Sequence, residues 1–300
     1  MFSDTHCHLS HIVQRGENLK ELLFALQDKE TPFVLDIGTK PGDLLSRVSL
    51  IHEATEENIP HFLHFTCGIW PESQSIANAK DSLKALENDL QSLLNRDSSI
   101  NKLLHKENIE YLALGECGLD RHWNGPQAAQ RPKDSSEDGP GTVDLKGEEA
   151  LFEAQLEMAK KYTLPIVIHS REAFEPTYGC IKNSGHDDGV IHCFSYEKKE
   201  AKAFLDRGWY ISFPGTITWA KKNTDRDRIA ELLRYVPKDR FLLETDAPYL
   251  TPTPHRGKTN TPLLIEHTYK AAAEYLGMDL ESLSLLVASN ARELFKARQG

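Results

Sequence analysis

Six possible metal ligands stand at the ends of short apolar runs in this sequence. They are His6, His8, Glu116, His169, His192 and Asp246. Imidazole nitrogens and carboxylate oxygens are the donors that zinc and related ions take from proteins. A single histidine in such a place is more often a core residue. Because the pattern recurs from position 6 to position 246, and burying these groups together without a cation is costly, the sequence favours one shared metal centre.

The number of donors predicts a pair of ions. His6 and His8 are two residues apart, so on a strand both imidazoles point to one face. Six donors exceed what one catalytic ion needs, and they suit two ions roughly 3.5–4 Å apart that share a carboxylate. The mixture of nitrogen and oxygen favours zinc or manganese, and magnesium stays possible. Asp4 either orients one of the imidazoles or has a structural role.

The elements that must position these residues alternate between strands and helices. A parallel (β/α)8 TIM barrel of α/β class is the expected fold, because its strand ends converge on one mouth. In a doubly wound open sheet the first and last strands would lie far apart. The expected strands are residues 1–9, 33–38, 61–69, 111–118, 164–170, 189–194, 209–213 and 240–246. The expected helices include residues 17–29, 44–57, 79–94, 148–162, 198–207, 226–235, 262–276 and 280–296.

The chain of 300 residues is expected to form one domain over residues 1–300. An insertion at residues 121–147, rich in Gly, Pro, Ser and charged residues, interrupts the alternation of strands and helices. It is either a lid or an incidental loop. The formal charge of −10 argues against a large basic surface along duplex nucleic acid, though not against an enzyme that grips a few phosphates.

The sequence has no apolar run long enough to cross a bilayer and does not begin like a signal peptide, so the expected location is cytoplasmic, with no membrane partner. An odd number of cysteines, five, argues against a disulfide framework. Cys7, Cys117 and Cys193 each adjoin a proposed ligand. Although thiolate can bind zinc, alternation along a strand predicts that these three pack outward as small apolar residues.

Several motifs in order along the chain resemble the TatD family of metal-dependent deoxyribonucleases. They are SDTHCHL at 3–9, LGECGLD at 114–120, LPIVIHSREA at 164–173, HCFS at 192–195, LLETDAPYLTP at 242–252, PHRGK at 254–258 and SNARELF at 289–295. The resemblance implies an amidohydrolase-like TIM barrel that cleaves DNA phosphodiesters, often as a 3′–5′ exonuclease. It further implies one ion on His6, His8 and Asp246, a second on His169 and His192, and Glu116 as the bridge.

The chain departs from the family pattern at Trp70, where Gly-x-His-Pro is usual and Gly68-Ile69-Trp70-Pro71 stands instead. Trp70 either stacks on a base or packs under the mouth. The insertion is also longer than the family leads us to expect. Both departures concern the choice of substrate more than hydrolysis itself.

The expected reaction is hydrolysis by a metal-activated hydroxide. Asp246 either receives the proton of the attacking water or serves only as a ligand, and Glu116 acts with it as the bridge. Arg171 and Arg256 would hold substrate phosphate, or are surface charges. The expected partner is single-stranded DNA or a 3′ end, and the oligomeric state stays open. The alternatives are a dinuclear metallohydrolase acting on a small ester, lactone or amide, and a barrel without catalytic activity.

Overall fold

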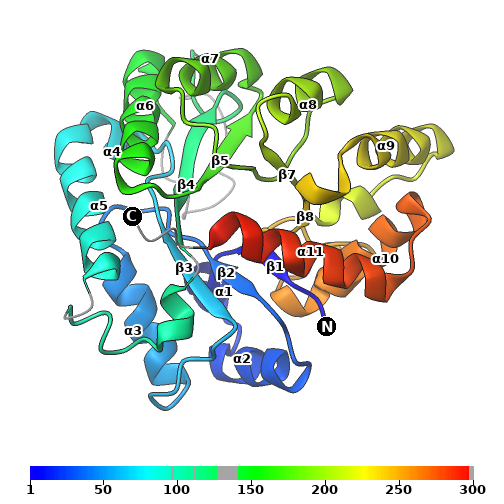
Figure 1. Cartoon of the computed structure of the whole chain (residues 1–300), viewed down its shortest axis with the longest axis horizontal. Helices are drawn as coiled ribbons and strands as arrows, with labels where there is room; N and C mark the ends of the chain where they lie inside the picture. The colour runs from blue at the N-terminus through cyan, green and yellow to red at the C-terminus, as the bar shows by residue number, and fades with distance from the viewer. Residues whose placement is uncertain (96–97, 111, 127–140, 297–300) are drawn as a thin grey trace.

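The computed structural model describes residues 1–95, 98–110, 112–126 and 141–296, and its centre is one sheet of eight parallel strands in the order β1 to β8 (Figure 1). The strands are β1 (Asp4–Cys7), β2 (Val34–Asp36), β3 (Leu63–Cys67), β4 (Leu112–Asp120), β5 (Ile166–Arg171), β6 (Gly189–Ile191), β7 (Tyr210–Phe213) and β8 (Phe241–Leu243). All eight predicted strands are therefore present, most of them shorter than predicted. The fold is the expected TIM barrel.

Helices surround the strands as an outer layer (Figure 1). They are α1 (Leu9–Gln14), α2 (Leu19–Asp28), α3 (Leu44–Ala54), α4 (Ser73–Ala77), α5 (Ala79–Leu94), α6 (Leu145–Tyr162), α7 (Phe174–Ser184), α8 (Lys198–Leu205), α9 (Asn223–Tyr235), α10 (Ile265–Leu276) and α11 (Leu280–Phe295). Short 3-10 helices η1 (Lys106–Ile109), η3 (Gly215–Thr218), η4 (Lys238–Arg240) and η5 (Pro262–Leu264) lie between them. None of the described helices is both long and apolar enough to cross a bilayer.

Two expectations about the helical layer need correction. The helices α1, α4 and α7 were not predicted. α1 and α4 are too short for a clear apolar period, and α7 contains Pro176 and Gly179, which read as breakers. The expected insertion at 121–147 is too long at its end, because residues 145–147 form the first turn of α6. Residues 127–140 of that insertion lie outside the described residues.

The barrel closes where the first strand meets the segment that follows the last one. Cys7 forms a parallel bridge with Ala247, and the His8 N–H donates to the Ala247 carbonyl at 2.7 Å. The Asp246 N–H donates in turn to the His6 carbonyl at 2.9 Å. This closure brings the first and last predicted ligands side by side, which an open doubly wound sheet would not do.

Two register irregularities occur beside ligand-bearing residues. Between β1 and β2, Asp4 pairs with Val34 and Cys7 with Asp36, so three steps on one strand match two on the next. Between β4 and β5, the pairs Leu114–Ile166 and Cys117–Ile168 show the same mismatch. A bulge re-aims the side chain that it contains. His6 lies within the first irregularity and Glu116 within the second.

Gly118 permits the close approach of β4 to β5 just past this second irregularity. Its φ is +140°, and a Cβ atom at this position would lie 2.0 Å from the His169 carbonyl oxygen. Only glycine tolerates both conditions. The sequence motif around Glu116 therefore has a backbone reason as well as a chemical one.

A buried network of ion pairs and hydrogen bonds stabilises the backbone at the end of β1. Arg47 on α3 is only 4% exposed, and it donates to Asp36 Oδ2 at 2.5 Å, to Asp43 Oδ1 at 3.0 Å and to the Thr66 carbonyl at 2.5 Å. Asp36 Oδ1 also accepts the Leu9 N–H at 2.9 Å. Because Leu9 directly follows His8, this network holds the backbone on which His8 is mounted.

The last helix, α11, packs at the end of the barrel where the strands begin. Asn290 of α11 donates to the carbonyls of Lys238 in η4 and of Phe241, the first residue of β8. Arg292 donates to the Pro32 carbonyl just before β2. The SNARELF motif therefore has a structural role at the N-terminal ends of the strands, away from the mouth.

Candidate metal centre

All six predicted ligands meet at the C-terminal ends of the strands, in two groups that share Glu116. In the first group, His6 Nε2 and His8 Nε2 are 3.2 Å apart. Glu116 Oε2 lies 3.4 Å and 3.6 Å from these two nitrogens. Asp246 Oδ1 lies 3.6 Å from His6 Nε2 and 3.5 Å from His8 Nε2. Four donor atoms thus face one point, and they come from β1, the residue directly after it, β4 and the segment after β8.

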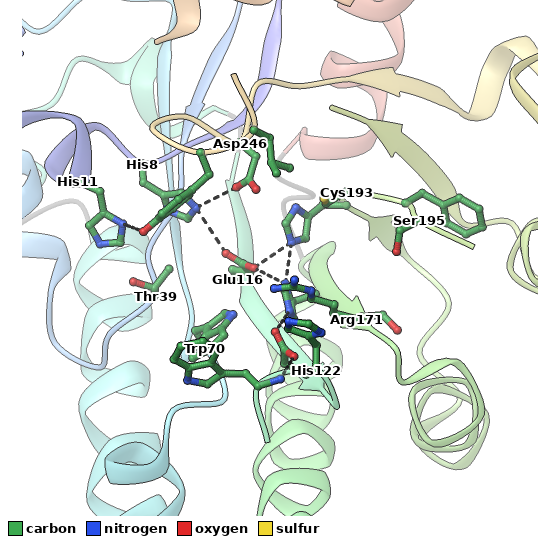
Figure 2. Close-up of a pocket in the computed structure, with 18 of the residues that line it drawn as sticks. His8, His11, Thr39, Trp70, Glu116, His122, Arg171, Cys193, Ser195 and Asp246 are labelled. Carbon is green, nitrogen blue, oxygen red and sulfur yellow. Dashed lines mark hydrogen bonds and ion pairs between the residues drawn. The ribbon is translucent and has the colours of Figure 1, made fainter. Parts of the chain in front are cut away.

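The second group uses the other oxygen of the same carboxylate. Glu116 Oε1 lies 3.0 Å from His169 Nδ1 and 2.9 Å from His192 Nε2. The two imidazole nitrogens are 3.3 Å from each other. His169 belongs to β5, and His192 follows β6 directly. Figure 2 shows Glu116 in the middle of the site, with contacts to both sides.

The spacing of these donors fits divalent cations. Ions bonded to nitrogen and oxygen at about 2.0–2.1 Å hold neighbouring ligand atoms roughly 2.9–3.4 Å apart in octahedral or tetrahedral coordination. The separations just given run from 2.9 Å to 3.6 Å, and the donors are nitrogen and oxygen without sulfur. Each group therefore suits an ion such as zinc, manganese or magnesium.

Residues behind the ligands orient three of the imidazoles. His8 Nδ1 lies 3.3 Å from the Ile37 carbonyl, to which it can donate. His169 Nε2 lies 2.9 Å from Asp120 Oδ2, and His192 Nδ1 lies 3.4 Å from Glu244 Oε1. Partners of this kind set the tautomer and direction of a ligating histidine. In each pair the other ring nitrogen is the one that faces Glu116.

Our sequence reasoning did not identify Asp120 and Glu244 as site residues. A signal was available, because Asp120 stands four residues after Glu116 and Glu244 stands two before Asp246, and even spacing on a strand returns a side chain to the same face. Both carboxylates are buried. Glu244 Oε1 also accepts the Cys193 N–H at 2.7 Å.

Of the two roles expected for Asp4, the structure shows the structural role. Its carboxylate accepts the N–H groups of His6 at 3.2 Å and Thr245 at 2.9 Å, and the Thr245 hydroxyl at 2.6 Å. These bonds tie β1 to the segment that leads to Asp246. Burial raises the pKa of Asp4 to about 7. Asp4 therefore positions backbone rather than an imidazole.

The pKa values at the site follow from burial and from nearby opposite charges. Burial alone would raise the pKa of Glu116, but His192 and His169 hold it well below its usual range. Burial alone would lower the pKa of His169, but hydrogen bonds to Asp120 and Glu116 bring it to about 9. Burial and the charge of His192 lower the pKa of His6 to about 4. Without ions, protons on some of the imidazoles offset the carboxylates, which is the electrostatic role a bound cation would take over.

Five of the six ligands, all except the fully buried His6, line a cavity of about 390 Å³, which Trp70 and Arg171 also line. The Trp70 ring lies edge-on to His169, with centroids 5.8 Å apart. Arg171 ends β5 and is exposed. Arg256 is not among the lining residues of this cavity, and its guanidinium stacks on Trp219 instead.

The cysteine prediction is wrong at one position. Cys7 and Cys117 are buried and point to backbone carbonyls, as expected for small filler residues. Cys193 is half-buried and lines the cavity. Its φ of +48° breaks the extended backbone just after β6, so the alternation of faces no longer applies there.

Comparison with known proteins agrees with the sequence motifs. A family model described as TatD related DNase matches residues 3–296. The chain is 28% identical over 298 residues to the uncharacterized metal-dependent hydrolase YabD of Bacillus subtilis, and the match covers 99% of each chain. It is 30% identical over 242 residues to a protein of a Rahnella strain named 3′-5′ ssDNA/RNA exonuclease TatD, with coverage of 79% of this chain and 78% of that protein.

Solved structures support the fold. The TatD homologue YJJV from Escherichia coli aligns with a TM-score of 0.73 at 22% identity, covering 99% of this chain and 98% of that one. A TatD family hydrolase from Entamoeba histolytica aligns with a TM-score of 0.75 at 17% identity and the same coverage. At these identities the likeness concerns the barrel architecture.

Proposed function

Because this chain belongs to the TatD-related DNase family of metal-dependent hydrolases, we propose that it hydrolyses phosphodiester bonds of single-stranded DNA, removing nucleotides from the 3′ end. The observation that carries the proposal is the placement of Glu116, each of whose oxygens faces a different group of imidazole nitrogens. The nuclease name of the Rahnella relative supports the choice of substrate.

In this proposal two divalent ions occupy the site. His6, His8 and Asp246 would hold one, His169 and His192 the other, and Glu116 would contact both. When bound, the ions supply Lewis acidity, which lowers the pKa of water and offsets charge on phosphoryl oxygens. The spacing and the chemistry of the donors support this assignment.

The protein's own groups would then handle the proton and the substrate. The side chain of Asp246 is 15% exposed and lines the cavity. Its carboxylate is therefore the group that receives the proton of the attacking water. Arg171 at the rim donates charge-assisted hydrogen bonds to a phosphate. Trp70 offers a ring on which a nucleobase stacks.

A product analysis tests the proposal. The metal-reconstituted protein is given single-stranded DNA labelled at the 5′ end, the same strand labelled at the 3′ end, duplex DNA, and a panel of small esters and cyclic amides. We expect mononucleotides from the 3′-labelled strand at the earliest times and a ladder of shortening 5′-labelled products. Turnover of small esters or amides without release of nucleotides would refute the nuclease proposal.

Two matched glutamine variants connect the activity to the site. Glu116→Gln keeps the shape of the side chain but removes the shared charge, so we expect loss of bound metal and at least about a hundredfold loss of kcat. Glu172→Gln changes a neighbouring carboxylate, which pairs with His122 at 2.7 Å and lies outside both ligand groups. It is expected to keep its metal. Equal metal content and activity in Glu116→Gln would contradict the assignment.

A further inference from the structure

A shallow groove adjoins the metal cavity and is lined by cationic and aromatic side chains. Its lining comprises Arg15, Trp219, residues 248–251 and residues 256–259. Three of these residues are cationic (Arg15, Arg256 and Lys258), and none carries a carboxylate. The whole chain has a net charge of −10, whereas the side chains of this groove carry only positive charge. Such a surface attracts anions.

Two arginines in the groove are stacked on aromatic rings. The Arg256 guanidinium carbon lies 3.8 Å from the Trp219 ring centroid, and that of Arg15 lies 4.7 Å from the Tyr249 centroid. The rings are themselves anchored. Trp219 Nε1 donates to the Thr251 carbonyl at 3.0 Å, and the Tyr249 hydroxyl lies 3.3 Å from a ring nitrogen of His11. Stacking of this kind holds a guanidinium in one plane. The Arg15 guanidinium also donates to the Pro248 carbonyl at 3.4 Å, which fixes it further.

The charges at the far end of the groove are not neutralised by acidic neighbours. Arg256 and Lys258 are exposed, and neither has a carboxylate partner within the described part of the chain. The lysine is fixed through its backbone, whose carbonyl accepts the Thr251 hydroxyl at 2.6 Å. The loop is thus held in place while both cationic side chains face solvent.

The groove shares two lining residues with the metal cavity. Tyr249 and Leu250 line both, and they lie three and four residues after Asp246 along the chain. A ligand that occupies the metal cavity can therefore extend past Tyr249 towards Trp219 without leaving the surface.

We propose that this groove, formed by Arg15, Tyr249, Trp219, Arg256 and Lys258, binds the uncleaved part of a single-stranded nucleic acid whose end lies at the metal centre. The inference rests on the proposed nuclease function and adds a second substrate-binding region to it. The three cations contact successive phosphates, and the aromatic and guanidinium faces stack with bases. Because a duplex keeps its bases paired, this arrangement favours single strands.

The test compares a strand with a substrate too small to reach the groove. The metal-reconstituted protein is assayed with a 12-nucleotide single strand and with bis(p-nitrophenyl) phosphate, and the ratio of the two kcat/KM values is recorded. We expect Arg15→Ala and the double variant Arg256→Ala/Lys258→Ala each to lower this ratio about tenfold or more. Arg240→Ala is the matched control, because Arg240 stacks on Tyr210 at 4.9 Å, at the opposite end of the barrel.

Direct binding separates failure of the groove from failure of the proposed function. Anisotropy of a labelled 12-mer on the same preparations is expected to show about tenfold weaker binding in the double variant. Its salt dependence should fall by roughly 1.4 in log–log slope, about 0.7 for each lost phosphate contact. Ratios and affinities equal to those of the wild type and Arg240→Ala would overturn the groove while leaving the nuclease proposal in place. Absence of cleavage in the wild type with groove-dependent binding would overturn only the nuclease proposal.

Discussion

Replacement of Asp120 by asparagine is expected to weaken metal binding at His169 and His192 and to spare the group around His6. Asp120 is buried, and its Oδ2 accepts from His169 Nε2 at 2.9 Å. Asparagine has nearly the same volume and can still accept through its amide oxygen, but it carries no charge. The imidazole of His169 then becomes a poorer donor to a cation, because its partner no longer stabilises positive charge on the ring.

The size of the effect follows from the change in hydrogen-bond type. A bond to a charged group contributes about 1.5–3 kcal/mol, and a neutral one about 0.5–1.5 kcal/mol. The difference of roughly 1–2 kcal/mol corresponds to about 5- to 30-fold in affinity at this one position, measured above pH 9, where no proton competes for His169 Nδ1. Glu244 lies 3.4 Å from His192 Nδ1, a longer contact, so Glu244→Gln is expected to cost less than Asp120→Asn.

The prediction includes a dependence on pH with a definite sign. The pKa of His169 is about 9 without metal, so below that pH an ion must displace a proton from Nδ1. Apparent affinity at this position should therefore rise about tenfold per pH unit between neutrality and pH 9, with release of one proton. Asp120→Asn removes one cause of the raised pKa. The proton release should then occur over a lower pH range.

Calorimetric titration with zinc or manganese, in buffers of different ionisation enthalpy, measures both the affinity and the released protons. Two results would refute the reasoning. One is an unchanged affinity and proton count in Asp120→Asn. The other is a larger loss of metal affinity in Glu244→Gln than in Asp120→Asn. The shorter contact, between Asp120 and His169, would then not be the stronger one.

Two further predictions concern stability. Arg47→Met leaves the buried Asp36 carboxylate without its partner, and it should lower the free energy of unfolding in urea by about 3–5 kcal/mol. Part of this loss should be regained in the double variant Arg47→Met/Asp36→Asn. A loss below about 1 kcal/mol in the single variant would contradict the role given to this network. Removal of metal by a chelator should lower Tm by about 4 °C for each ion that had been present at roughly a hundred times its Kd, measured by differential scanning calorimetry. An unchanged Tm after verified removal of metal would argue against coupling between the site and the fold.

The ligand set could be proposed from sequence because its signal is local. Each donor ends an apolar run, and apolar runs that alternate with amphipathic stretches predict a barrel whose strand ends converge. The structure brings together all six residues so proposed. The barrel itself was equally accessible, since strands buried on both faces carry apolar runs, as at residues 166–168 and 241–243.

Other features depend on backbone geometry that a pattern of residue types does not carry. The irregular registers at His6 and Glu116 and the left-handed backbone of Cys193 change which way side chains point without changing the composition. Arg256 lies away from the metal cavity because the loop after β8 determines its place, and loop paths have no periodic signal. Asp120 was missed although its spacing was regular, because the predicted strand ended at residue 118, whereas β4 continues to Asp120.

The closure of the barrel has a consequence for the order of events during synthesis. Thr245 bonds to Asp4 across 241 positions of sequence, and the next residue, Asp246, lies 3.6 Å from His6 Nε2 and 3.5 Å from His8 Nε2. A nascent chain presents its His-x-His pair from the start but gains the final oxygen donor only after most of the polypeptide has left the ribosome. Complete loading of the centre is therefore a late event in maturation, and truncated chains should fail to retain the full complement of ions.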